Sequence, residues 1–400
     1  MIPVFRHNLS AFPTDAEIEE IARWSNRDFE GLKKQLEDVF SDLVHTQEGI
    51  LNSIRSNGFR DFSDSRVHIG GFGTREPLKE LFLCHKDAEL TGKYDPSEMA
   101  VVTGFGPSGS PTAGTLSMMF RLVELQKQTE VPIHVSIPDL GFLNFRTLDA
   151  RELLSYSSRF EAFLRGLGLS GERVCIRRQN DTDLMRTFFL VTSVLRSEDF
   201  FLNSEAAHGL YDKLHKQGSS FSTFVHYALC VADILLPVFR DGKKLIIVLS
   251  GIDEYYFSTL ADIVVRRLQD SGAGMECLVS PDVRTCSLFG RLIEGLYPFV
   301  KMSKSIPESS INLDDSDEVL SQKILSCAPR NEQVILDMMM LASNWDPEKK
   351  VAAKEAFEQR SEAWRSFKKE YLELFLSLKR LWEGTAENSR PDIRSTIFCP

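Results

Sequence analysis

The central part of the chain alternates short apolar runs with amphipathic stretches. From about residue 97 the apolar runs are "MAVVTGF", "PIHVSI", "RVCIRR", "KLIIVLS" and "ECLVS". Between them, apolar residues recur at helical spacing over 148–167, 182–196, 222–235 and 254–269. "LIIVLS" is apolar throughout, as expected of a strand covered on both faces. The alternation predicts an α/β fold with a doubly wound parallel sheet, which binds ligands beyond the carboxyl ends of its strands.

Helical patterns flank this central part on both sides. The segment before it opens with a capping-box sequence, "TDAE" at Thr14–Glu17, and ends in the strand-like "RVHIGGF". We interpret it as an accessory helical layer without chemistry of its own. The predicted organisation is a mostly helical N-terminal extension (1–95), a Rossmann-like domain (96–300), a loop and linker (301–325), and a C-terminal helical domain (326–400).

The C-terminal part carries a long apolar stripe with steps of three and four residues. Its members are Trp364, Phe367, Tyr371, Leu374, Leu378 and Leu381. Such a stripe is more typical of a core than of a binding face. Over 346–382 there are nine Lys and Arg against seven Asp and Glu, so this segment is mildly basic and leaves an RNA contact open.

Composition narrows the class of protein. Hydrophobic residues make up 42% of the 400 residues and charged residues 26%, as in globular proteins. The chain has no apolar run of 18 residues and its first residues lack a signal-peptide pattern, so we expect neither a membrane partner nor secretion. A net charge of −10 argues against general binding of DNA. Seven scattered cysteines without a CxxC pair suit a reducing cytoplasm, and the eight histidines show no metal-ligand spacing.

A glycine-rich stretch follows the first apolar run, "VTGFGPSGSPTAGTL". Its glycines predict a tight turn, and a helix is expected to begin near Thr112. Helix N-termini bind phosphate because their first backbone N–H groups are unpaired and the dipole end is positive. The stretch is therefore a candidate phosphate site, although it could also be a tight connection alone.

A second candidate lies far downstream, in "FVKMSKSIPESS". Lys301 and Lys304 alternate with Ser303 and Ser305, as in a solvated loop or a clamp for phosphates. A phosphate clamp needs a second phosphate-binding element far upstream, on another strand-to-helix turn, and 189 positions of strand–helix alternation separate Lys301 from Thr112 (301 − 112). This spacing favours the clamp.

Together these stretches resemble the two signatures of class I aminoacyl-tRNA synthetases, and most closely the tryptophanyl and tyrosyl branch. "KMSKS" matches the second signature residue for residue, and "GFGPSGSPTAGTL" is similar to the first. "HVSIPDLGFLNFR", "VHYALCVADILLP" and "VLSGIDEYYFSTLADIVVRRL" resemble further segments of the branch. The resemblance spans about 99–325, is weak over 1–95 and is loose over 330–400. It implies ATP-dependent formation of an aminoacyl adenylate, release of pyrophosphate, transfer to an acceptor such as tRNA, ATP and Mg²⁺ as cofactors, and a homodimer.

The resemblance also implies roles for individual residues. The catalytic set on the phosphates would be Lys301, Lys304, Ser303, Thr112 and Thr115. The remaining ATP contacts would be Gly104, Gly106, Ser108, Gly114, Gly251, Asp253, Met302 and Ser305. The amino-acid pocket, for an aromatic substrate, would comprise Asp233, Glu254, Val102, Ser136 and Asp139. Asp233 would accept a hydrogen bond from the substrate side chain, unless it caps a turn or pairs with an arginine instead.

Four departures from the branch leave the overall function open. Thr115 replaces His or Asn, Glu254 replaces Gln, and Val102 and Ser136 stand where eukaryotic-type pockets have Tyr and Gln; the C-terminal region is also short. The chain could be a working tryptophan– or tyrosine–tRNA ligase. It could be a repurposed paralogue that adenylates an amino acid and passes it to a small molecule or protein in a biosynthetic pathway. A non-enzymatic binding or regulatory protein is a third hypothesis, which the intact "KMSKS" argues against.

Overall fold

Six strands form one sheet with a parallel centre. The computed structural model describes residues 14–37, 81–83, 93–143, 149–200, 221–251, 254–270, 279–296, 302, 307–327 and 329–386. The strands are β1 (Leu81–Leu83), β2 (Met99–Gly104), β3 (Ile133–Ile137), β4 (Val174–Arg178), β5 (Leu245–Ser250) and β6 (Arg284–Gly290). They lie in the order β1-β6-β5-β2-β3-β4; β2 to β6 are parallel, and only β1 runs antiparallel to its neighbour. The predicted doubly wound α/β fold is confirmed.

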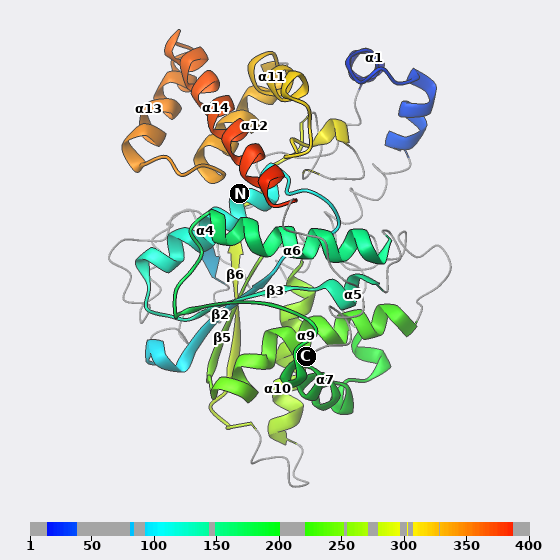
Figure 1. Cartoon of the computed structure of the whole chain (residues 1–400), viewed down its shortest axis with the longest axis vertical. Coiled ribbons are helices and arrows are strands. Elements are labelled where there is room, and N and C mark those ends of the chain that lie inside the picture. The colour runs from blue at the N-terminus through cyan, green and yellow to red at the C-terminus, as the bar shows by residue number, and fades with distance from the viewer. Residues whose placement is uncertain are drawn as a thin grey trace.

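Helices cover both faces of the sheet (Figure 1). α4 (Ala113–Gln128) and α6 (Ala150–Gly166) cover one face, and α7 (Thr182–Val194), α9 (Phe221–Asp241) and α10 (Tyr255–Asp270) cover the other. Side chains of β2 alternate between the two cores: Met99 and Val101 pack with α4 and α6, whereas Ala100 and Val102 pack with α9 and α10. This double burial explains the continuous apolar strands.

The prediction of a strand at "ECLVS" was wrong. Of that run the structure describes only 279–280, and these two residues are not in a strand. The fifth parallel strand is β6, "RTCSLFG", whose polar residues concealed it. Its polar groups have partners in the fold: Ser287 Oγ hydrogen-bonds to Ser258 Oγ on α10 at 2.7 Å, and Arg284 Nη1 donates to the carbonyl of Pro281 at 2.7 Å.

In the described part of the C-terminal region the α-helices are α12 (Glu332–Leu341), α13 (Pro347–Glu358) and α14 (Ala363–Gly384). They are preceded by α11 (Asp317–Leu325), a helix within the segment predicted to be loop and linker. The predicted stripe on α14 is mainly core, but it is shifted along its second half. The buried apolar positions of α14 are Trp364, Tyr371, Phe375, Leu378 and Trp382. Leu381, expected in the stripe, is 36% exposed, because Trp382 occupies the buried position of that turn.

The N-terminal residues described here pack onto the rest of the protein. α1 (Asp15–Ser25) begins with the predicted capping box, in which the Thr14 N–H donates to Glu17 Oε2 at 2.8 Å. Buried apolar residues of α1 and of the helical residues 29–37 belong to the main core. Arg27 Nη1 pairs with Glu308 Oε1 at 2.8 Å, within the 3₁₀ turn η4 (Pro307–Ser309) that follows "KMSKS". The strand expected at "RVHIGGF" lies outside the described residues.

Among the helices in the described part of the chain, none is both long and apolar enough to cross a membrane.

Candidate functional site

A cavity of about 130 Å³ lies at the carboxyl ends of β2 and β5. These two strands are neighbours, and the chain leaves β2 toward β3 on one side and β5 toward β6 on the other. The cavity therefore occupies the switch point at which doubly wound sheets bind ligands. Six residues assigned to the site from sequence line it: Val102, Gly104, Gly106, Ser136, Asp233 and Glu254.

The cavity is mainly apolar, with a few polar groups. Phe142 and Phe257 contribute aromatic walls. α9 contributes His226, Cys230 and Asp233, which are four and three residues apart and so share one face of the helix. A slot of this kind suits a flat apolar group with a polar tip.

Asp233 both lines the cavity and pairs with an arginine. Its side chain is buried, with Oδ1 3.2 Å from Arg177 Nη2 and Oδ2 accepting from Gln179 Nε2 at 2.6 Å. Burial raises the pKa of Asp233 above its ordinary value, while the Arg177 charge and hydrogen bonds from Ser136 and Gln179 act in the opposite direction. The pairing with an arginine, which the sequence left as an alternative, is therefore observed, and the hydrogen bond from a substrate side chain stays a prediction.

Asp139 does not line the cavity, contrary to its assignment to the amino-acid pocket. It is 2% exposed, and its Oδ1 accepts from the backbone N–H groups of Gln179 at 3.0 Å and Leu140 at 2.9 Å. Gln179 Oε1 in turn accepts from the Gly141 N–H at 2.7 Å. Asp139 thus ties the end of β4 to α5 (Asp139–Leu143) behind the pocket.

Sequence reasoning missed Arg177 and Gln179 as site residues. A signal was present, since "RVCIRRQN" places polar residues at the end of an otherwise apolar strand. Such residues at the carboxyl end of a parallel strand can face a ligand site.

The glycine-rich turn forms as expected, but the helix that follows it has fewer unpaired N–H groups at its N-terminus than predicted. Gly109 adopts φ +137°, which favours glycine, and Thr112 caps α4 by accepting the Thr115 N–H at 3.2 Å. The two threonine hydroxyl oxygens are also 3.2 Å apart. The Ala113 N–H donates to the carbonyl of Ile311 at 2.9 Å. Two of the first-turn amides are therefore already paired, which narrows the predicted phosphate site.

The first signature is joined to the segment that follows the second. Besides the bond from Ala113 to Ile311, the Leu313 N–H donates to the carbonyl of Pro111 at 3.1 Å, and Thr112 forms an antiparallel bridge with Asn312. The start of α4 therefore contacts residues 311–313, and the role of Lys301 and Lys304 as a phosphate clamp beside it stays a prediction.

Five residues of the predicted site lie outside the described residues, namely Lys301, Ser303, Lys304, Ser305 and Asp253. The roles assigned to these five stay predictions. Met302 is described, and its side chain is 7% exposed within the main core, which indicates an anchor rather than the assigned nucleotide contact.

The remaining predicted residues lie around the cavity mouth and the signature turn. Ser108 is exposed, and its N–H donates to the carbonyl of Gly106 at 2.9 Å. Gly114 is half-buried in the first turn of α4. The carbonyl of Gly251 accepts the Glu254 N–H at 3.0 Å just before α10, and Glu254 is exposed where it lines the cavity. A carboxylate here favours a cationic group of the ligand.

Substitution of Gly106 by alanine is expected to destabilise the site by about 1–3 kcal/mol. An added Cβ would overlap the ring of Phe142, a cavity-lining residue, so the ring would have to shift. Thermal unfolding of Gly106→Ala should show a lower midpoint, and Phe142→Leu in the same chain should restore part of the loss. Gly114→Ala is the control, because the Cβ there would meet only Thr112 Oγ1 at an ordinary 3.5 Å. Equal midpoints for the two alanine variants would contradict the prediction.

Comparison with known proteins identifies a single family. The family model described as tRNA synthetases class I (W and Y) matches residues 95–390. The chain is similar to the tryptophan–tRNA ligase of Methanopyrus kandleri, with 26% identity over 243 residues, 60% of this chain and 59% of that protein. The corresponding ligase of Methanocaldococcus jannaschii is 26% identical over 259 residues, 62% of this chain and 64% of that protein. The chain thus spans less than two thirds of the length of either relative.

Among solved structures, the fold is similar to a tryptophanyl-tRNA synthetase from Encephalitozoon cuniculi bound to tryptophan. The TM-score is 0.62 and the identity 15%, over 87% of this chain and 98% of that one. At this identity the similarity shows the fold alone.

Proposed function

The chain belongs to the class I tRNA synthetases of the W and Y group, and on this basis we propose that it is a ligase that activates an aromatic amino acid with ATP and transfers it to tRNA. The observation that carries the proposal is the cavity at the switch point, which has Asp233 and the first-signature residues Gly104 and Gly106 in its wall. The reaction class follows from membership of the family. The cavity is the basis for proposing an aromatic amino acid as the substrate.

The proposed first step joins the amino acid to AMP. A carboxylate oxygen of the amino acid attacks the α-phosphorus of ATP, and the bond from that phosphorus to the departing pyrophosphate breaks. Such a reaction needs positioning and charge neutralisation more than a protein nucleophile. Lys301 and Lys304 would neutralise the departing phosphates, and the hydroxyl groups of Thr112 and Thr115 at the start of α4 would donate to phosphate oxygens. ATP would enter as its Mg²⁺ complex.

The proposed substrate follows from the shape and polarity of the cavity. Apolar atoms form most of its wall, and the buried Asp233 offers an acceptor. An aromatic amino acid with an N–H or O–H on its ring fits this arrangement, because a buried acceptor rejects a side chain that lacks a donor. The names of the two sequence relatives favour tryptophan over tyrosine.

A second candidate function has a different acceptor. Glu254 places an exposed carboxylate at the cavity, where the family resemblance leads one to expect glutamine. A retuned pocket of this kind favours a paralogue that passes the activated amino acid to a small molecule or a protein. The two candidates share the first step and differ only in the second.

The experiment is ATP–pyrophosphate exchange with each of the twenty amino acids and with non-standard ones, followed by charging of total tRNA. Exchange with one aromatic amino acid and charging of tRNA would support the ligase. Exchange without charging would favour the paralogue, and exchange with no amino acid would refute both.

Replacement of Lys304 by alanine is expected to lower the exchange rate by about 100-fold, because one charge on the departing phosphates is lost. Initial rates at saturating amino acid measure this effect. Lys369→Ala is the control, since Lys369 lies exposed on α14. A Lys304→Ala rate equal to that of the control would remove the lysine from the proposed mechanism.

Two further properties are proposed with the function. We place the protein in the cytoplasm, because its seven scattered cysteines without a CxxC pair suit a reducing compartment. We propose a homodimer from the family resemblance, and sedimentation equilibrium would test it.

A further inference from the structure

Arg177 lies directly behind the acidic wall of the cavity. It is on β4 and pairs in register with Ser136, which lines the cavity from β3. Its side chain is 6% exposed, and its Nη2 donates to the backbone carbonyl of Asp233 at 2.7 Å as well as to the Asp233 carboxylate. One guanidinium nitrogen thus fixes both the backbone and the side chain of Asp233.

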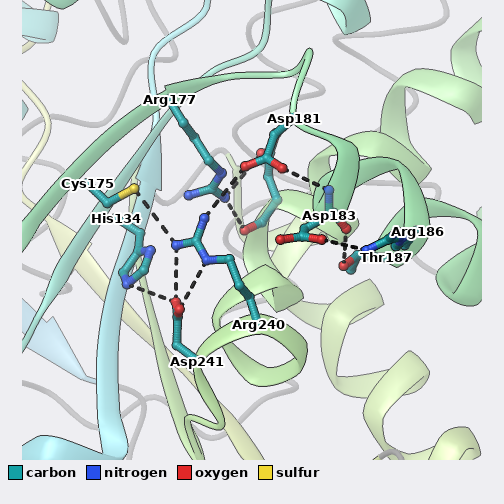
Figure 2. A network of polar contacts seen from close by, with 10 residues as sticks. His134, Cys175, Arg177, Asp181, Asp183, Arg186, Thr187, Arg240 and Asp241 are labelled. Carbon is teal, nitrogen blue, oxygen red and sulfur yellow. Dashed lines mark hydrogen bonds and ion pairs between the residues drawn. The ribbon is translucent and has the colours of Figure 1, made fainter. Parts of the chain in front are cut away.

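The neighbouring charged residues pair with one another, and Arg177 forms its ion pair with Asp233. Figure 2 shows Arg177 beside a cluster around Arg240, which pairs with Asp241 at 3.0 Å and with Asp181 at 3.6 Å. In the same cluster, burial and the nearby Arg177 lower the pKa of His134 to about 4, so this ring is neutral at pH 7. Among the ion pairs of the described residues, the carboxylate on Arg177 is that of Asp233.

Gln179 fixes the second oxygen of the same carboxylate. It is fully buried, and its Oε1 accepts from the Gly141 N–H, so its Nε2 must face Asp233. Each Asp233 oxygen therefore receives at least one donor from the protein. Because a carboxylate has about four acceptor positions, Asp233 can still accept a further hydrogen bond from a ligand in the cavity.

We propose that Arg177 and Gln179 are positioning residues, which hold Asp233 as an ionised, oriented acceptor and thereby determine selectivity for a ring that carries an N–H or O–H donor. The inference rests on the proposed amino-acid activation and names the residues behind its selectivity. Without Arg177, the buried carboxylate would bind a proton more readily and would present an O–H and a weaker, neutral acceptor. A ring donor would then gain less over an isosteric ring without one.

Other titratable groups also face Asp233 and enter its pH dependence. His226 and Cys230 lie on its own helix, Asp139 approaches from α5 and Glu254 from the start of α10. From α7, the charged Asp183 and Arg186 pair with each other at 3.1 Å. Arg177 is the cation in contact with the carboxylate, so its removal should dominate any change.

The test compares Arg177→Met with Arg178→Met, a matched control one residue along β4 whose guanidinium donates to Ser158 Oγ at 2.8 Å on α6. Pyrophosphate exchange is measured with L-tryptophan against L-3-benzothienylalanine, which lacks the N–H, and with L-tyrosine against L-phenylalanine. In Arg177→Met the preference for the donor-bearing amino acid should fall by about 10- to 100-fold, with the KM for ATP unchanged. Arg177→Lys should recover part of the preference.

The pH profile gives a second readout, which a purely structural role would not move. An ionised Asp233 is needed, so activity is lost as pH falls through its pKa. Because Arg177 lowers that pKa, its removal should move the acidic limb of kcat/KM to higher pH. If Arg177→Met and Arg178→Met share the same preference and the same acidic limb, the inference is wrong.

Two further arms keep the test decisive. If circular dichroism shows that Arg177→Met is unfolded, Gln179→Met takes its place, and a retained preference there overturns the inference. If the wild type exchanges pyrophosphate with no amino acid, the proposed function fails. Titration calorimetry of the folded wild type and variants then measures the affinity for each of the same four amino acids. Equal wild-type affinities within each pair would overturn the inference.

Discussion

Replacement of Asp233 by alanine is expected to lower the free energy of unfolding by about 3–5 kcal/mol, because it leaves a buried charge without a partner. Arg177 has a side chain 6% exposed, and Asp233 is its ion-pair partner at 3.2 Å. The substitution also removes the acceptor for Gln179 Nε2, a fully buried donor. Chemical denaturation followed by circular dichroism measures the change.

The double variant Asp233→Ala, Arg177→Met separates the charge from the packing. It should recover a large part of the loss, because the uncompensated guanidinium is gone. Arg266→Ala is the surface control: its pair with Asp262 is 63% exposed on the arginine side, and its loss should cost less than about 1 kcal/mol. A cost for Asp233→Ala no greater than that of the control would mean that Arg177 finds another partner.

Replacement of Trp382 by alanine is expected to cost a similar amount, about 3–5 kcal/mol, through lost packing. The indole is fully buried near the end of α14 and meets α6 of the α/β domain. The rings of Phe160 and Phe163 approach it edge-on at 5.4 and 5.5 Å, and the Arg159 guanidinium lies 4.0 Å from its centroid. Its loss removes the largest buried side chain that joins α14 to α6.

The indole nitrogen adds a link to the segment after the second signature, since Nε1 donates to Asp314 Oδ1 at 3.0 Å. Trp382→Phe retains the ring and loses this bond, so it should cost about 1–2 kcal/mol. Val351→Ala, at a side chain 55% exposed on α13, should change the free energy of unfolding by less than about 0.5 kcal/mol. A Trp382→Ala midpoint close to that of Val351→Ala would show that the C-terminal helices do not depend on this contact.

Local sequence patterns predicted most of the strands and helices of the α/β fold. The strands β2, β3, β4 and β5 and the helices α6, α7, α9 and α10 lie where the apolar periodicity placed them. The helix ends agree within two residues except at α9, which ends at Asp241 rather than at residue 235. Periodicity works there because burial on one or both faces is a property of consecutive residues. It failed at β6, whose polar residues are satisfied by α10 and by a turn, and near Trp382, where the buried stripe lies one residue from the predicted one.

By itself the sequence determined the α/β class, the order of the elements and the two signature stretches, since each is written in neighbouring residues. The tertiary structure alone decided which polar groups meet. Arg177 and Gln179 reach Asp233 across 56 and 54 positions, and Thr112 bridges to Asn312. The contacts to Asp233 depend on the packing of α9 against the face of the sheet next to β4. The bridge at Thr112 depends on the segment around Asn312, which lies against the start of α4. A periodicity in the sequence tells which face a residue takes, but the partner on that face follows from strand order.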